Sequence, residues 1–235
     1  MKQLLTSGLT QLGLTPPESA VGSLIQYCDL LLEQNQVMNL TAITQPDHVA
    51  TLHFLDSAAV LTAAEFQEKS VIDVGTGAGF PGLPMKILVP SLHLTLLDSL
   101  GKRISWLQQV CTQLGLEGVT CLHARAEEQA LVSGFRDCFD FAVSRAVAPM
   151  SLLCELCLPY VKVGGRFIAM KAVDCGEECS AAARGIQRLG GRLLPSVNYN
   201  IPHTDITHRL VVVEKCAPTP KGYPRRWAKI QKSPL

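Results

Sequence analysis

A short glycine-rich segment between an apolar stretch and a helical pattern has the residues best suited to bind a ligand. The apolar stretch Val71–Val74 contains Asp73 and runs into a loop in which Gly75, Gly77 and Gly79 alternate with other residues. Glycine adopts positive φ at no steric cost and leaves space for a ligand against the main chain. A turn from strand to helix is also a favourable edge for binding a cofactor. These residues therefore predict a cofactor site at the loop.

A second carboxylate, Asp98, follows the loop about twenty residues later in the sequence. The next predicted strand, residues 94–97, ends at Asp98. A carboxylate about twenty residues beyond such a loop is the residue that binds ribose hydroxyls in nucleotide-cofactor sites. The loop and Asp98 together predict a cofactor that contains adenosine.

The glycine spacing and the acid before it distinguish between two cofactors. NAD sites have Gly-x-Gly-x-x-Gly and hold a pyrophosphate at the helix N-terminus, whereas the loop here is Gly75-x-Gly77-x-Gly79 after Asp73. This pattern is typical of methyltransferases that use S-adenosylmethionine. A carboxylate would repel a pyrophosphate but attract an ammonium and a sulfonium. The pattern favours S-adenosylmethionine, with an NAD-dependent oxidoreductase or an ordinary tight turn as the alternatives.

From residue 71 onward, short apolar runs alternate with helical patterns. The predicted strands are residues 71–74, 94–97, 119–122, 139–143, 166–170, 193–199 and 209–214, of which 193–199 is the weakest. This alternation predicts an α/β fold, a seven-stranded and mostly parallel sheet with helices on both faces. Ligands bind outside the carboxyl ends of such strands, where the glycine loop, Asp98, Ala126–Glu127 and Ser144–Arg145 are expected to meet.

Composition limits the class of protein. The chain has 235 residues, 47% of them hydrophobic, and no apolar run long enough to span a membrane. Its start lacks the apolar block of a signal peptide. Nine scattered cysteines in such a chain are expected to be reduced thiols, so we predict a cytoplasmic protein without membrane contact. Cys154 and Cys157 have no second ligand pair, so we expect them in the core and predict no metal site.

The last residues carry a strong positive charge. Residues 215–235 contain six basic residues and no acid, together with Tyr223 and Trp227. Cations interleaved with aromatic side chains are typical of nucleic-acid contact, although a solvated tail would have the same charge. Prolines in this stretch predict an extended arm over residues 216–235. The candidate RNA-binding residues are Lys221, Arg225, Arg226, Lys229 and Lys232.

Several motifs occur in one order along nearly the whole chain. They are Asn39–Ile43, His53–Ser57, Asp73–Pro84, Leu96–Arg103, Ser144–Ala146 and Tyr223–Arg226. Together they resemble the glucose-inhibited division protein B family, bacterial methyltransferases that modify N7 of a guanine in small-subunit (16S) ribosomal RNA. The chain departs from the family pattern at Ala172, where a glycine is usual, and at Trp227–Ile230, where a Gly-x-Pro stretch is commoner.

The resemblance implies a domain organisation and a set of cofactor contacts. It implies a class I (Rossmann-like) methyltransferase domain at residues 67–215, a helical cap at 1–66 and the basic arm at 216–235. The cofactor contacts that it implies are Gly75, Phe80, Ala126, Glu127 and Arg145. From the residues themselves we add Asp98 for the ribose, and Asp73, Gly77 and Gly79 for the shape of the loop and the cationic end of S-adenosylmethionine.

The resemblance also implies a simple reaction on small-subunit ribosomal RNA or an assembling 30S particle. Guanine N7 has a free lone pair, so the enzyme needs no general base and acts chiefly by positioning. Arg145 and Lys171 are the candidate catalytic residues, although Arg145 could instead form a salt bridge to Asp73 or Asp140. His53 and Asp56 could contact the substrate or simply pack the cap. An RNA chaperone or assembly factor that binds the cofactor without turnover is the alternative function.

Overall fold

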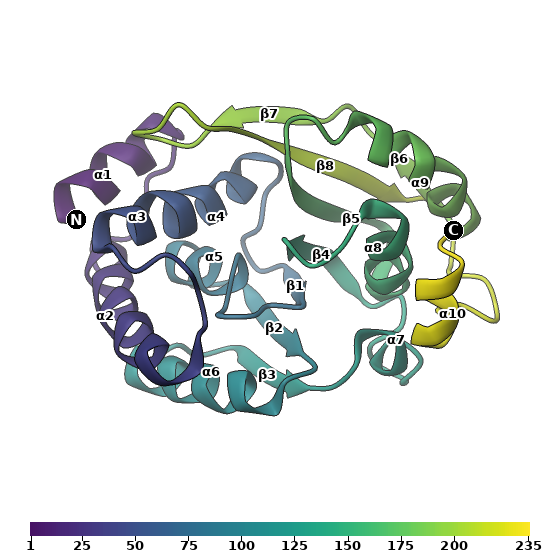
Figure 1. Cartoon of the computed structure of the whole chain (residues 1–235), viewed down its shortest axis with the longest axis horizontal. Coiled ribbons are helices and arrows are strands. Elements are labelled where there is room, and N and C mark those ends of the chain that lie inside the picture. Colours follow the sequence, from purple (N-terminus) through teal and green to yellow (C-terminus); the bar gives the residue numbers. More distant parts are fainter.

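A central β-sheet organises the molecule, and the computed structural model describes all residues from 1 to 235 (Figure 1). The strand order is β3-β2-β1-β4-β5-β8-β6, and β7 also pairs with β8. Strands β1 to β5 are parallel, whereas β8 runs antiparallel to β5, β6 and β7. The strands are β1 (Ser70–Val74), β2 (His93–Asp98), β3 (Val119–His123), β4 (Phe139–Arg145), β5 (Val161–Ala172), β6 (Gly191–Leu193), β7 (Val197–Asn200) and β8 (Thr207–Lys215).

The predicted α/β fold is confirmed, but the sheet has eight strands rather than seven. The weak strand predicted at 193–199 is divided into β6 and β7, which pair with different parts of β8. Pro195 lies between them and has no amide hydrogen to donate to a neighbouring strand. Pro195 therefore explains why the predicted strand is interrupted, which the apolar pattern alone did not indicate.

Helices cover both faces of the sheet and build two cores. Along β1 the side chains alternate, so that Val71 joins the first core while Ile72 and Val74 join the second. The first core includes the N-terminal helices, α5 and α6, and the second includes α8, α9 and α10. The helices are α1 (Lys2–Gln11), α2 (Ala20–Met38), α3 (Pro46–Val49), η1 (Ala50–Leu55), α4 (Asp56–Ala58), η2 (Ala59–Thr62), α5 (Gly82–Leu88), α6 (Gly101–Gln113), α7 (Ala126–Gln129), α8 (Met150–Cys157), η3 (Leu158–Tyr160), α9 (Gly176–Arg188) and α10 (Trp227–Lys232).

The C-terminal arm differs from the expected extended chain. Residues Trp227–Lys232 form α10, which lies beside α7 and α8 (Figure 1). The prolines of the arm stand at 218, 220, 224 and 234, so none interrupts this short segment. Ile230 anchors the helix because its side chain is fully buried in the second core. None of the helices combines the length and the apolar character that a membrane crossing requires.

Candidate cofactor and substrate site

The glycine loop leaves the end of β1 and takes its shape from main-chain contacts. Gly75, Gly77 and Gly79 all have positive φ, at 73°, 60° and 94°. The amides of Gly75 and Thr76 both donate to the carbonyl of Leu97 at the end of β2, at 2.8 and 3.0 Å. A Cβ on Gly75 would lie 2.7 Å from a methyl of Val147. Glycine is therefore required at Gly75 by both backbone conformation and space.

Asp73 supports the loop from below. Its side chain is fully buried, and its Oδ2 accepts hydrogen bonds from the Thr76 hydroxyl at 2.7 Å and the Gly82 amide at 2.8 Å. Its Oδ1 is buried without a partner, and burial raises the pKa of the carboxyl to about 6. Asp73 is not among the residues that line the cavity above it, so its direct contact is with the loop.

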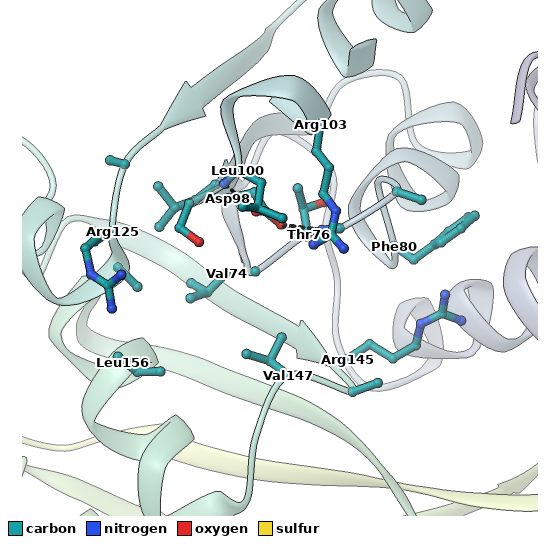
Figure 2. Close-up of a pocket in the computed structure, with 18 of the residues that line it drawn as sticks. Val74, Thr76, Phe80, Asp98, Leu100, Arg103, Arg125, Arg145, Val147 and Leu156 are labelled. Atoms are coloured by element: carbon teal, nitrogen blue, oxygen red, sulfur yellow. Dashed lines mark hydrogen bonds and ion pairs between the residues drawn. The ribbon is translucent and has the colours of Figure 1, made fainter. Parts of the chain in front are cut away.

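A cavity of about 580 Å³ opens over this edge of the sheet (Figure 2). The lining includes the predicted Gly75, Gly77, Phe80, Asp98, Ala126, Glu127 and Arg145. Gly79 lies outside the lining, where a Cβ would be 2.5 Å from the Tyr27 hydroxyl. Arg125 and Leu156 lie at one end of the cavity, and Phe80 and Arg145 at the other (Figure 2). The sheet thus brings most of the predicted cofactor residues together.

Asp98 lies between the two ends, at the end of β2. Only 5% of its surface is exposed, and its Oδ2 accepts the amide of Gly77 at 3.0 Å. Its Oδ1 accepts the amide of Leu100 at 2.9 Å, and an Arg103 nitrogen lies 3.4 Å from Oδ2. The carboxylate is thereby oriented by the loop that it faces, with further lone pairs for hydroxyl donors.

Ala126 and Glu127 begin α7 beside the same cavity. The Ala126 carbonyl accepts the Tyr160 hydroxyl at 2.6 Å, which fixes the start of the helix. The Glu127 side chain is buried, and its Oε1 lies 2.6 Å from Nε of Arg125. These contacts hold the first turn of α7 against the cavity.

Arg145 has different partners from those expected. Its guanidinium pairs with Asp56 at 3.0 Å and donates to the Leu52 carbonyl at 3.2 Å, rather than binding Asp73 or Asp140. It also donates to Nδ1 of His53 at 3.1 Å. Its carbon Cζ lies 4.7 Å from the centre of the Phe80 ring. Arg145 therefore joins the end of β4 to the N-terminal helices.

The elements that carry these partners have unusual backbone conformations. His53 belongs to η1, a π-helical turn, and such turns are often found at functional sites. Ala146, directly after Arg145, has a φ of 54°, which is rare for a residue with a side chain. Backbone strain of this kind is frequent at binding and catalytic sites.

The ionisable groups around Arg145 have shifted pKa values. Burial and the nearby Arg145 charge lower the pKa of His53 to about 4, so its ring is neutral near pH 7. Burial acts to raise the pKa of Asp56, but hydrogen bonds from His208 and Tyr199 and the Arg145 charge hold it below its ordinary value. The hydrogen bond to Asp56 raises the pKa of His208. Asp56 is thus a buried anion among cationic and polar groups.

A second cavity of about 380 Å³ adjoins the first. Both are lined by His53, Arg145 and Ala146. Lys171 lines only the second cavity, and its Nζ contacts the Ala148 carbonyl at 2.7 Å and Glu178 at 2.6 Å. The two candidate catalytic residues, Arg145 and Lys171, therefore share this cavity.

Several lining residues were not predicted. Leu40 and Thr41 reach the first cavity from the N-terminal part of the chain, and Trp227 reaches it from α10. His208, from β8, lines the second cavity. The order of motifs offered a signal for Thr41, which lies in one of them, but no local pattern connects Trp227 with a loop that precedes it by about 150 residues.

The candidate RNA-binding residues divide into two groups. Arg225 is committed to the fully buried Glu155, with its amide and Nε at 2.7 and 2.8 Å from Oε1. The side chains of Lys221, Arg226, Lys229 and Lys232 are exposed. Of the five candidates in the arm, only these four are free to meet a phosphate backbone.

Comparison with known proteins identifies the family. A family model described as "GidB: rRNA small subunit methyltransferase G" matches residues 21–205. The chain belongs to the GidB family of methyltransferases. It is 45% identical over 235 residues to the ribosomal RNA small subunit methyltransferase G of Alkaliphilus metalliredigens, covering 100% of this chain and 98% of the relative. It is 46% identical over 233 residues to the protein of the same name from Clostridium beijerinckii, covering 99% and 98%.

Solved structures outside the GidB family share the fold. TrmN from Thermus thermophilus is 20% identical, with a TM-score of 0.53 over 68% of this chain and 48% of that chain. TYW2 from M. jannaschii, solved in complex with AdoMet, is 13% identical, with a TM-score of 0.50 over 64% and 69%. These likenesses confirm the class I methyltransferase fold predicted from the sequence.

Proposed function

We propose that the protein transfers the methyl group of S-adenosylmethionine to N7 of a guanine in small-subunit ribosomal RNA. The relatives in the GidB family are named for a ribosomal RNA substrate, and TYW2 was solved with this cofactor. The observation that carries the proposal is the junction of two cavities at Arg145, His53 and Ala146. One cavity has the residues for the methyl donor, and the other is open to a methyl acceptor.

The residues of the first cavity fit S-adenosylmethionine. Asp98 is oriented toward the loop and would bind the ribose hydroxyls. Gly75 leaves a cradle that a Cβ would fill, which suits close approach of the cofactor to the main chain. The unpaired Oδ1 of Asp73 places negative charge beneath the loop, which favours a cationic ligand over a pyrophosphate. When bound, the cofactor supplies an electrophilic methyl on a sulfonium.

The direction of the cofactor follows from the position of the second cavity. The methyl must face the acceptor, so the methionine part belongs at the end that has Phe80 and Arg145. The adenosine then lies toward Ala126 and Glu127 at the other end. Asp98 lies between the two ends, and the ribose would bind beside it.

The residues around Arg145 would act by positioning guanine rather than by moving a proton. N7 has a free lone pair, so no group needs to deprotonate it. Arg145 would donate to guanine O6 or to a phosphate and leave the N7 lone pair free. Asp56 offsets the charge of Arg145, so that positive charge arriving on the purine is opposed less strongly. Alignment of the acceptor with the methyl can lower a barrier by roughly 7–11 kcal/mol.

Basic residues outside the junction would hold the RNA. Lys171 lies in the second cavity, where it would contact the base or a neighbouring phosphate. The exposed Lys221, Arg226, Lys229 and Lys232 would contact phosphates farther along the strand. Arg225 is omitted from this group because both oxygens of the fully buried Glu155 hold it, whereas Lys171 lines the second cavity although it pairs with the half-buried Glu178.

Two measurements test the proposal. S-adenosylhomocysteine should raise the melting temperature of the protein, and NADH should not. Small-subunit RNA, free or in assembling 30S particles, should then gain 7-methylguanosine, detected by mass spectrometry of its nucleosides. Binding of S-adenosylhomocysteine with no methyl transfer to either form of RNA would support the assembly-factor alternative instead. A rise in melting temperature with NADH alone would overturn the cofactor assignment.

A further inference from the structure

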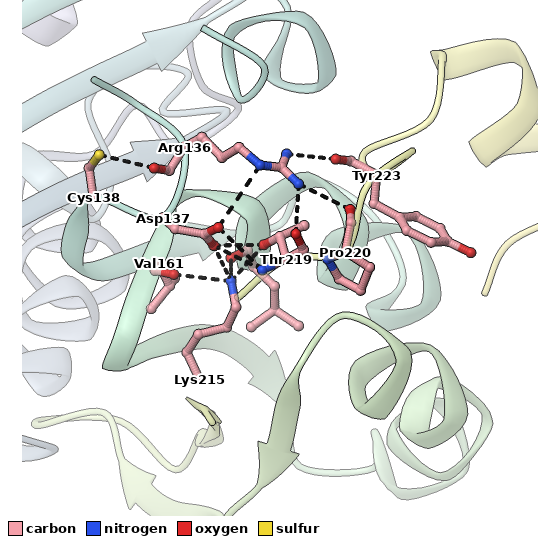
Figure 3. Close-up of polar contacts among 9 residues, drawn as sticks. Arg136, Asp137, Cys138, Val161, Lys215, Thr219, Pro220 and Tyr223 are labelled. Atoms are coloured by element: carbon pink, nitrogen blue, oxygen red, sulfur yellow. Dashed lines mark hydrogen bonds and ion pairs between the residues drawn. The ribbon is translucent and has the colours of Figure 1, made fainter. Parts of the chain in front are cut away.

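The C-terminal arm is fastened to the methyltransferase domain by a buried cation. The Lys215 side chain, at the end of β8, is fully buried, and its Nζ lies 2.6 Å from Asp137 Oδ1 (Figure 3). The same nitrogen donates to the Thr219 hydroxyl at 2.7 Å and to the carbonyls of Leu158 and Val161 at 2.6 and 3.0 Å. A buried ammonium is tolerated only with this many partners, so the beginning of the arm is held in one place.

Arg136 holds the next part of the arm through its main chain. Its guanidinium donates to the carbonyls of Thr219, Pro220 and Tyr223, at 2.8, 3.0 and 2.6 Å (Figure 3). Arginine has a rigid planar set of donors, so one side chain fixes the path of five consecutive residues. The arm therefore reaches residue 223 along a defined course.

The Arg225 and Glu155 pair completes the attachment beside the cofactor cavity. Arg225 makes charge-assisted contacts with both oxygens of Glu155, whose side chain is fully buried in α8. Leu156, the next residue in α8, lines the cavity. The arm is thus joined to the wall of the cavity two residues before α10 begins.

Trp227, the first residue of α10, then forms part of that wall. Its half-buried indole packs against the second core, and Arg125 Cζ lies 5.7 Å from its ring centre. Ala124, Ala126 and Leu156 line the same cavity, and with Trp227 they give this end a largely apolar surface. The two charged residues at this end, Arg125 and Glu127, pair with each other at 2.6 Å, whereas Arg145 and its polar partners lie at the opposite end.

We infer that Trp227 is a cofactor-binding residue whose indole packs against the adenine of S-adenosylmethionine, and this inference depends on the proposed function. Adenine is the flat, apolar part of the cofactor, whereas the methionine part is charged. An aromatic wall at the end remote from the methyl acceptor suits adenine and does not suit the charged methionine part. The cofactor site therefore includes the C-terminal arm. Trp227, which lies outside the sheet, shapes the adenine end of the cavity.

The test compares Trp227→Ala with Trp227→Phe by calorimetry. The ligands are S-adenosylhomocysteine and 5′-methylthioadenosine, which retains adenine but has no amino acid part. Loss of the indole should weaken both ligands about tenfold, since stacking on an aromatic ring is a substantial part of base binding. Trp227→Phe should restore most of the affinity. Turnover should show a raised KM for S-adenosylmethionine with kcat little changed.

A spectroscopic measurement separates contact from a merely structural role. The chain has two tryptophans, and Trp106 is buried in the first core. In a Trp106→Phe variant, Trp227 is the only indole, and its fluorescence should change when 5′-methylthioadenosine binds. Unchanged fluorescence at saturation, or equal affinities of Trp227→Ala and the parent protein, would overturn the inference. Failure of the parent protein to bind S-adenosylhomocysteine would instead overturn the proposed function.

Discussion

The glycine loop and the C-terminal arm line one cavity but are held in place by different kinds of interaction. The loop is short, and its shape depends on glycine conformations, main-chain bonds to Leu97 and the carboxylate of Asp73. The arm depends on ion pairs with Asp137 and Glu155 and on hydrogen bonds from Arg136 to its carbonyls, and these partners are 70 or more positions away in the sequence. A local turn is encoded by its own residues, whereas the position of the arm is encoded by pairs of side chains on separate elements.

This difference implies different responses to mutation. A side chain added to the loop enters the ligand space directly, so binding should fail even if the protein folds. A charge removed from the arm leaves its partner buried and unpaired, so stability should fall first. Measurements of cofactor affinity and of folding stability therefore distinguish variants of the loop from variants of the arm, because a different quantity falls first in each.

The largest effect is expected from Gly75→Asp. The new side chain would meet Val147, force a residue with a Cβ into positive φ and add an anion to the site. We expect calorimetry to detect no binding of S-adenosylhomocysteine. Gly115→Asp is the matched control, because it adds the same side chain at a φ of 61°, meets no neighbouring atom and lies outside the cavity lining. Affinity within a few-fold of the parent in Gly75→Asp would show that the cofactor lies elsewhere.

Lys215→Met should have the largest effect on folding. It removes the cation and leaves the partly buried Asp137 with Thr219 and a longer contact to Arg136 at 3.9 Å, a change that costs about 3 kcal/mol of unfolding free energy. Urea unfolding with a linear extrapolation measures the loss. The double variant Lys215→Met, Asp137→Asn should recover part of it, because the carboxylate that has lost its lysine is then neutral. A loss below about 1 kcal/mol in the single variant would mean that the network does not hold the arm.

Two neighbouring arginines separate attachment of the arm from RNA contact. Arg225→Met should release α10 and weaken S-adenosylhomocysteine binding about tenfold, as loss of the Trp227 ring would. Arg226→Met should leave that affinity unchanged, because its side chain is exposed. It should instead lower the salt dependence of RNA binding by about one phosphate contact. The opposite pattern in the two variants would reverse these assignments.

The smallest expected effect is a pH dependence of cofactor affinity that arises from Asp73. Burial raises the pKa of this acid to about 6, so it is protonated below that pH and ionised above it. Ionised Asp73 favours a cation, so affinity for S-adenosylmethionine should rise with pH. Calorimetry should find binding up to about fourfold weaker at roughly pH 5.5 than at about pH 7.

Folding stability should depend on Asp73 in the opposite direction. The folded pKa is above the value of the unfolded chain, so the folded state binds the proton more tightly, and this contribution to stability is lost as pH rises through about 6. The variant Asp73→Asn should lose both dependences. An unchanged pH profile of cofactor affinity in Asp73→Asn would assign that profile to another group.

The glycine loop, the fold and the position of Asp98 were predictable because each follows from local spacing. A window of about a dozen residues is enough to recognise a strand from its apolar pattern and a tight turn from its glycines. Arg145 could be placed at the ligand-binding edge of the sheet because it ends a predicted parallel strand. Its role as a cofactor contact, and that of Phe80, needed the family resemblance.

Contacts between distant elements were not predictable in the same way. The alternative reading of Arg145 was a salt bridge to Asp73 or Asp140, but it pairs with Asp56, which the N-terminal helices bring to the end of β4. Asp140 instead pairs with Lys162. The predicted extended conformation is wrong for residues 227–232, because all prolines of the arm lie outside α10. Side-chain pairs such as these depend on how helices dock, which spacing alone does not determine.

The Tyr27 hydroxyl donates to the Ala78 carbonyl, 51 residues later in the chain. The tyrosine is fully buried in α2 and stacks on Phe54, with its ring centre 5.3 Å from that of the phenylalanine. The glycine motif is therefore incomplete without a helix that contains none of its residues. A genetic screen for inactive enzymes would recover substitutions in α2 that mimic damage to the motif. A truncated chain beginning at β1 would retain every residue of the glycine motif yet lose the support that shapes it.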